Sequence, residues 1–248
     1  MRAKNQLVIL VVGLSILGCN SNPDERDLRN AQTPAQLYAS AQDSLTAGNY
    51  RAAVFKLENL DTRFPFGEFA EQAKLDLIYA HHASGNKEAA IDAADTFIRE
   101  NPRHKDVDYA YYMKGVVYFE GGKNILERWF RIDPSDRPPS DAARSYEALN
   151  LMLGRYPDSQ YAPDAQKRMV HLRNRLATYE YHVAEYYMRR GAFVGAVNRV
   201  DYILTNYSGA TITPKALEIM VDAYERLGMD DKAADAQRIL EENYPNRG

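Results

Sequence analysis

The sequence of 248 residues contains a single cysteine and no excess of basic residues. One cysteine cannot form an intrachain disulfide bond, which excludes a fold held together by disulfides. The 31 lysine and arginine residues are outnumbered by 34 acidic residues, so the net charge at pH 7 is −3. Without residues 1–18, which contain Arg2 and Lys4 but no acid, it becomes −5. Such a chain lacks the cations that neutralise phosphate groups, so we expect no nucleic-acid partner.

Motifs that mark common catalytic sites are also missing. The chain has no Gly-x-Ser-x-Gly nucleophile elbow, no phosphate-binding loop and no His-Glu-x-x-His zinc motif. His81 and His82 are adjacent and would point about 100° apart on a helix, so they cannot share a ligand face. Asp133, Asp136 and Asp141 lack the glycine and the closing glutamate of a calcium loop. We therefore expect no catalytic residue, no metal and no cofactor, in a protein that is not an enzyme.

A repeated unit organises the chain instead. In its first copy a helix-like segment ends at Gly48, the chain turns, and a second segment ends at Pro65, 17 residues after the glycine. The same spacing separates a glycine from a proline, or in one case a serine, in three further pairs: Gly85 and Pro102, Gly191 and Ser208, and Gly228 and Pro245.

The second segment of each unit carries residues of one type at aligned positions. A small residue recurs in all five copies, at Ala53, Ala90, Ser145, Ala196 and Ala233. A larger apolar residue follows seven positions later, at Leu60, Phe97, Met152, Ile203 and Leu240. This spacing keeps both positions on one face of a helix. The small residue lets two helices approach closely, the larger one fills the gap, and the proline stops the second helix.

The pattern resembles the tetratricopeptide repeat, a helix-turn-helix unit of about 34 residues. Such a unit buries its apolar face only against neighbouring units. The resemblance therefore implies an all-α superhelical solenoid of about five repeats, with a concave face for binding.

Two irregularities interrupt the regular spacing. The third repeat contains about 18 extra residues, 122–139, so its second helix should begin near Ser140. This insertion holds Trp129 and Phe130, and it either folds back on its own repeat or contacts a partner. The fourth repeat is about 14 residues too long. Since no glycine or proline interrupts residues 164–190, we predict added helical turns there.

The N-terminus has the composition of a signal peptide. After a short basic start, residues 7–17 are largely apolar but too few to cross a bilayer core of about 30 Å. They lead into Leu17-Gly18-Cys19, which resembles the bacterial lipobox. This resemblance implies cleavage before Cys19 and its lipidation, and two or more acyl chains anchor a protein stably. The alternative is a plain secretory signal. The polar residues 20–33 would form a flexible tether.

Several longer segments are more specific than the repeat. They are Arg63-Phe64-Pro65-Phe66-Gly67, residues 75–80, residues 179–187 and Val197-Asn198-Arg199-Val200. Together with the lipobox and the five repeats, these segments resemble the BamD family of tetratricopeptide lipoproteins in the outer-membrane β-barrel assembly machine. The resemblance implies a lipid-anchored scaffold on the periplasmic face of the cell outer membrane, and Asn20 is compatible with export there.

The family resemblance also implies the partners. The C-terminal repeats would dock the periplasmic POTRA domains of the barrel subunit BamA, and other Bam lipoproteins would bind the scaffold. The N-terminal repeats would receive unfolded outer membrane β-barrel proteins. The candidate substrate-binding residues are Arg63, Phe64, Phe66 and Tyr79, and the candidate partner-binding residues are Trp129, Phe130, Asn198 and Arg199. Phe64 departs from the tyrosine common in the family, which removes any role for a hydroxyl group there.

Arg199 lies beside a predicted buried stripe. At 100° per residue, Ala196, Val200 and Ile203 share one helix face, and Arg199 falls on its flank. From there the aliphatic stem can pack while the guanidinium reaches the surface, where it can pair with a partner carboxylate. The alternative is an ion pair within the chain, with Asp201 or with a neighbouring repeat.

The chain would then divide in order into a signal peptide (1–18), a lipidated tether (19–33), N-terminal repeats (34–104), a third repeat (105–163) and C-terminal repeats (164–248). Two other functions compete with the scaffold of β-barrel assembly. A pilotin-like or peptidoglycan-associated repeat lipoprotein would need neither the insertion nor the extended fourth repeat. A cell-wall hydrolase would need paired acids or a nucleophile in a pocket, and the sequence offers no clear candidate.

Overall fold

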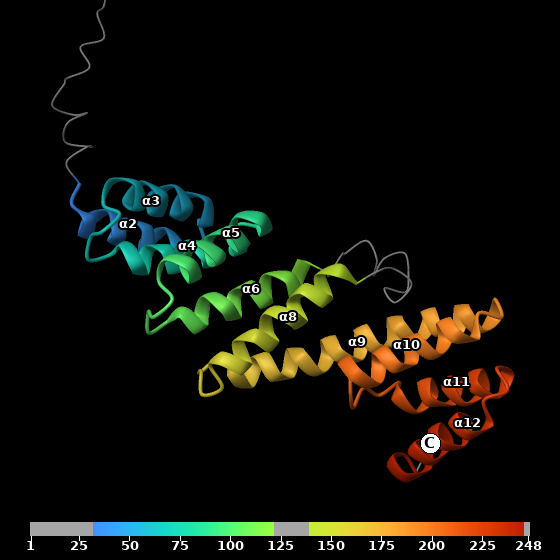
Figure 1. Ribbon diagram of the computed structural model, residues 1–248. Coiled ribbons are helices and arrows are strands. Elements are labelled where there is room, and N and C mark those ends of the chain that lie inside the picture. The colour runs from blue at the N-terminus through green and yellow to red at the C-terminus, as the bar shows by residue number, and fades with distance from the viewer. Residues whose placement is uncertain (1–31, 122–138, 246–248) are drawn as a thin grey trace, which may run out of the picture.

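The computed structural model describes residues 32–121 and 139–245, which form ten α-helices and no strand (Figure 1). The helices are α2 (Pro34–Thr46), α3 (Tyr50–Arg63), α4 (Ala70–Ala83), α5 (Lys87–Glu100), α6 (Val107–Gly121), α8 (Ser140–Arg155), α9 (Ala162–Arg189), α10 (Phe193–Asn206), α11 (Thr213–Arg226) and α12 (Asp230–Asn243). They follow one another along an elongated array from α2 to α12. Each helix packs against its sequence neighbours, and α4 also contacts α6, as α9 contacts α11. The predicted solenoid of five helix pairs is confirmed.

The turn inside a helix pair depends on glycine. Four of these turns contain one glycine in the left-handed region, with φ of 71° at Gly48, 82° at Gly85, 70° at Gly191 and 67° at Gly228. A Cβ atom would strain this backbone, which explains why glycine recurs at the predicted spacing. In the first turn, the side chain of Asn49 accepts a hydrogen bond of 3.3 Å from the N–H of Ala52 and caps α3.

The predicted stripe of small and large residues is buried in every pair. Both aligned positions of α3, α5, α8 and α10 are fully buried, and those of α12 are at most 6% exposed. The residue four positions after the large one plays the same part in every pair; these residues are Phe64, Asn101, Tyr156, Tyr207 and Tyr244. Its N–H donates to the carbonyl of the large residue over 2.8–3.0 Å and closes the last helical turn. Proline follows in four of these places, where it cannot continue the helix.

Ser145 occupies the small position of α8, where the other pairs have alanine. Its buried hydroxyl donates a hydrogen bond of 2.8 Å to the carbonyl of Gly115 in α6. A Cβ atom on Gly115 would overlap the fully buried side chain of Leu149. The close approach of α6 and α8 therefore depends on the absence of a side chain at Gly115.

The extra residues of the fourth pair lengthen α9 to 28 residues, against 14 for α10, which confirms the predicted helical turns. The first half of α9 packs against α6, where the Tyr112 hydroxyl donates to Asp164 over 2.6 Å and Arg168 lies 4.8 Å from the ring centre of Phe119. Its second half packs against α10 and α11. No helix in the described residues combines the length and apolarity needed to cross a membrane.

The third pair has its second helix where the spacing predicts it, since α8 begins at Ser140. Of the insertion 122–139, only Pro139 belongs to the described residues. The proposed signal peptide, Cys19 and most of the tether also lie outside them, as do Trp129 and Phe130.

Candidate binding surfaces

Three of the four candidate substrate residues meet where α3 passes into α4. Arg63 ends α3, and its guanidinium carbon lies 5.2 Å from the ring centre of Phe64, the next residue. Phe66 follows Pro65 in the turn and is 99% exposed. An aromatic ring that is almost wholly open to solvent can bury its apolar surface only against another molecule.

A cavity of about 360 Å³ lies beside Phe66, between the start of α4 and the end of α5. Lys74 lines it and pairs with Glu100 over 2.7 Å and with Asp61 over 3.8 Å. On the same rim, Glu71 lies 3.4 Å from a ring nitrogen of His104. Because these charges already have partners, the exposed Phe66 is the group in this surface most available to bind an apolar side chain.

Tyr79 does not join this surface. Its ring contacts that of Tyr50 edge-on, with 5.9 Å between the centres, and the hydrogen bond to Tyr50 and burial raise the pKa of the Tyr79 phenol. Tyr50 begins α3 and Arg63 ends it. Thirteen residues of helix correspond to roughly 20 Å, so Tyr79 lies about one helix length from Arg63.

Arg199 lies on the flank of the α10 stripe, as predicted, and it has an ion-pair partner within the chain. Its Nη1 donates to Glu180 Oε2 of α9 over 3.0 Å, with 41% of the arginine side chain and 12% of the glutamate side chain exposed. The intramolecular pair considered from the sequence is thus present, but with Glu180 in place of Asp201. Its geometry leaves part of the guanidinium in solvent, where further N–H donors remain.

Two exposed apolar residues accompany Asn198 on the outer face of α10, and sequence analysis missed both. Val194 is 59% exposed and Tyr202 is 44% exposed, and with the exposed Asn198 they are spaced four residues apart. This spacing puts the three on one face, opposite the buried stripe. Val194 and Tyr202 could have been identified from the sequence, because they are two apolar residues on the helix face opposite the buried stripe of α10.

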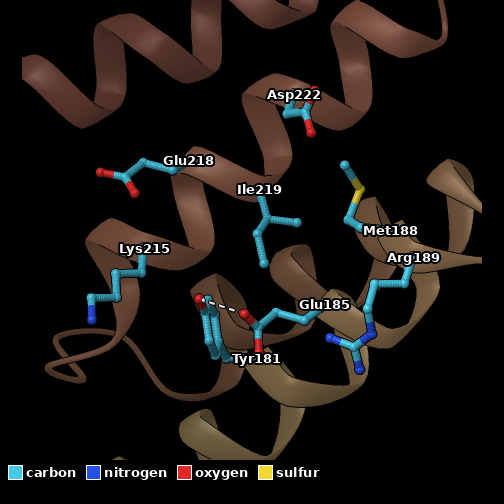
Figure 2. A pocket seen from close by; sticks show the side chains of 8 residues that line it. All are labelled: Tyr181, Glu185, Met188, Arg189, Lys215, Glu218, Ile219 and Asp222. Atoms are coloured by element: carbon cyan, nitrogen blue, oxygen red, sulfur yellow. Dashed lines mark hydrogen bonds between the residues drawn. The ribbon is translucent and has the colours of Figure 1, made fainter.

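A further groove lies between α9 and α11, and sequence analysis did not identify it. A cavity of about 340 Å³ lies between the two helices. Figure 2 shows Ile219 near the middle of its lining residues. The α9 wall includes Tyr181, Glu185 and Arg189, and the α11 wall includes Lys215 and Asp222. Each set follows helical spacing, but only packing of α9 on α11 brings the two faces together.

Two acids of this groove are engaged by their own neighbours. Glu185 accepts a hydrogen bond of 3.1 Å from the Tyr181 hydroxyl, and its second oxygen lies 3.1 Å from His182 Nδ1. Burial and the Glu185 carboxylate raise the pKa of Tyr181 to about 12, so the phenol stays protonated and can donate. Asp222 pairs with Arg226 over 3.0 Å.

Comparison with known proteins identifies the family. The family model of the outer membrane lipoprotein YfiO matches residues 30–239. The chain belongs to the YfiO family. Among curated relatives, the outer membrane protein assembly factor BamD of Vibrio cholerae is 37% identical over 241 residues, which cover 97% of this chain and 99% of the relative. The BamD of Neisseria meningitidis serogroup A is 37% identical over 245 residues, or 98% of this chain and 92% of the relative.

The solved structure of the MamA protein covers 84% of this YfiO-family chain and 90% of its own chain at 16% identity. Its TM-score is 0.35, too low to support any further comparison.

The described part of this YfiO-family chain holds no group of three or more histidine, cysteine or acidic residues suited to a metal ion. The Nε2 atom of His81 lies 3.8 Å from Glu58 Oε1, and the Nε2 atom of His82 lies 3.3 Å from Glu120 Oε2. The adjacent histidines therefore have separate partners. Asp141 pairs with Lys87 over 2.6 Å. Asp133 and Asp136 lie outside the described residues.

Proposed function

We propose that this protein is a scaffold lipoprotein of the β-barrel assembly complex, which helps β-barrel proteins fold and insert by binding both the barrel subunit and the substrates. The observation that carries the proposal is the 37% identity to BamD of Vibrio cholerae, an outer membrane protein assembly factor, over 99% of that relative. A solenoid supports such a role because its helix pairs offer several separate surfaces along one chain.

The proposal assigns a separate task to each part of the array. Repeats in residues 34–104 bind unfolded substrates at Arg63, Phe64 and Phe66. Repeats in residues 164–248 dock the POTRA domains of BamA through Asn198 and Arg199. The insertion 122–139 contacts a partner through Trp129 and Phe130, and other Bam lipoproteins bind elsewhere on the scaffold.

Lipidation of Cys19 would hold the scaffold on the periplasmic face of the outer membrane, with residues 20–33 as a tether. The substitution Cys19→Ser should give an unlipidated protein, because serine cannot accept the thioether-linked lipid of a lipobox cysteine. We expect it to leave the membrane fraction when cells are fractionated without the barrel subunit. If the Cys19→Ser protein stays in the outer membrane under those conditions, Cys19 does not anchor the protein.

A photo-crosslinker in place of Phe66 tests the scaffold function itself. We expect it to capture unfolded β-barrel proteins, because the exposed ring stands beside a cavity of about 360 Å³. The matched control is a crosslinker in place of Phe55, a second exposed phenylalanine (68%) that is not part of that cavity lining. Equal capture at both positions, or equal capture of soluble periplasmic proteins at position 66, would contradict a specific substrate surface.

A further inference from the structure

The guanidinium of Arg199 is held from α9 by a second side chain besides Glu180. The Glu180 carboxylate accepts a hydrogen bond from Nη1 over 3.0 Å. Burial by itself lowers the pKa of Arg199, but hydrogen bonding to the Glu180 carboxylate and to the Tyr187 hydroxyl outweighs burial and raises that pKa. Glu180 and Tyr187 are seven residues apart, or two turns of α9, so both side chains leave the helix on the side that faces α10.

The ring of Tyr187 is supported by the backbone of α10. A Cβ atom at Gly195 would lie only 3.2–3.4 Å from three ring carbons of Tyr187, so the ring occupies the space that a side chain would need. Gly195 precedes Arg199 by four residues and therefore lies on the same side of α10, one turn away. This packing limits the movement of the ring and keeps its hydroxyl beside the guanidinium.

A guanidinium that is already oriented binds a partner more tightly. Its five N–H donors lie in one plane, and a carboxylate pairs with two of them only along one edge of that plane. Glu180 and Tyr187 engage part of the group, while 41% of the Arg199 side chain remains exposed. A free arginine side chain loses rotamer freedom when it binds, and an arginine that its own protein holds in place loses less.

We propose that Tyr187 is a positioning residue for the docking of BamA. Together with Glu180, its hydroxyl orients the Arg199 guanidinium so that the exposed edge meets a carboxylate of BamA. In this role Tyr187 acts through Arg199 and does not itself contact the partner. The inference rests on the proposed function, because it assumes that Arg199 docks the barrel subunit.

The substitution Tyr187→Phe tests the role, since it removes the hydroxyl and keeps the ring against Gly195. We expect binding of the full-length protein to purified BamA in detergent to weaken by about two- to tenfold, the effect of one lost hydrogen bond. The melting temperature should stay within about 4 °C of the wild type. The matched control is Tyr186→Phe, the adjacent tyrosine, whose ring faces Arg190. This control should bind BamA like the wild type.

A second measurement separates orientation of Arg199 from direct contact with BamA. In protein with isotope-labelled arginine, NMR reports how fast each guanidinium group rotates about its Cζ–Nε bond, and Arg199→Lys assigns the Arg199 signal by removing it. A lost hydrogen bond frees the group, so Tyr187→Phe should speed the rotation of Arg199 by at least about twofold in the absence of BamA. Tyr186→Phe should leave the rotation unchanged.

Faster rotation of Arg199 together with weaker BamA binding, both in Tyr187→Phe alone, supports the positioning role. Weaker binding without faster rotation would mean that Tyr187 contacts BamA directly. Unchanged binding would mean that the hydroxyl is not needed for docking, and either result overturns the inference. The proposed function is tested separately by the swap Glu180→Arg/Arg199→Glu. If the swapped protein loses BamA while Tyr187→Phe binds normally, Arg199 docks the barrel subunit without help from Tyr187.

Discussion

The double substitution Glu180→Arg/Arg199→Glu is expected to abolish co-purification with BamA while the protein stays folded. The swap restores an ion pair between α9 and α10 with its charges exchanged, so the two helices keep their attraction. The BamA carboxylate that we propose as a partner of Arg199 would instead meet a glutamate, and like charges in an interface repel. Pull-down of BamA from solubilised outer membranes, with a thermal melt of each variant, measures both effects.

The single substitution Arg199→Glu cannot separate docking from folding. It places two carboxylates together, one of them on the largely buried Glu180. We expect it to lower the free energy of unfolding by about 1–3 kcal/mol, less than for a fully buried pair because water reaches Arg199. For a chain of this size each kcal/mol corresponds to a melting temperature lower by about 2–4 °C.

A matched swap tests whether any exchanged ion pair disturbs the scaffold. Lys114 of α6 pairs with Asp95 of α5 over 2.6 Å, also between neighbouring helices and outside the C-terminal repeats. Asp95→Lys/Lys114→Asp should therefore leave BamA recovery unchanged. If the Glu180→Arg/Arg199→Glu protein is stable and recovers BamA at the wild-type level, Arg199 holds α9 against α10 and does not dock the barrel subunit.

The substitution Gly115→Val is expected to destabilise the third helix pair more than any surface change. The added side chain overlaps Leu149, which is fully buried, and it forces α6 away from α8. Overpacking of this kind costs about 1–3 kcal/mol. Weakening the Ser145 hydrogen bond to the Gly115 carbonyl adds about 0.5–1.5 kcal/mol.

Gly154→Val is the matched control for this prediction. Gly154 also lies in a helix, α8, but a Cβ atom there meets no other atom within 4 Å. The replacement of glycine by valine changes helix propensity in the same direction in both variants. The difference between their free energies of unfolding therefore reports the packing between α6 and α8. Urea unfolding followed by circular dichroism should show a lower midpoint for Gly115→Val alone. Equal midpoints would mean that the two helices separate at little cost.

The features that could be predicted from the sequence act within a single repeat and recur from one repeat to the next. The turn glycines, the small and large stripe positions and the terminal prolines each act within about 17 residues, so aligned copies reveal them. The length of α9 could be predicted for the same reason, because a helix without glycine or proline continues.

Features that depend on how helices align in space could not be predicted. Glu180 and Arg199 are separated by 19 residues and meet only because the turn after α9 sets the register of α10. The α9–α11 groove needs two faces that are unremarkable on their own helices. Tyr79 was grouped with Arg63 through the family resemblance, although the length of α3 separates them.

The 28-residue α9 also has a mechanical consequence. Most junctions between helix pairs rely on packing between separate short helices, and such contacts can slide or bend. At the junction of the third and fourth pairs, one continuous helix of roughly 42 Å packs at one end on α8 and on the α6 side chains Tyr112 and Phe119, and at the other end on α10 and α11. A continuous hydrogen-bonded helix resists bending, so we expect the third and fourth pairs to keep a more constant relative orientation than pairs joined only through short helices.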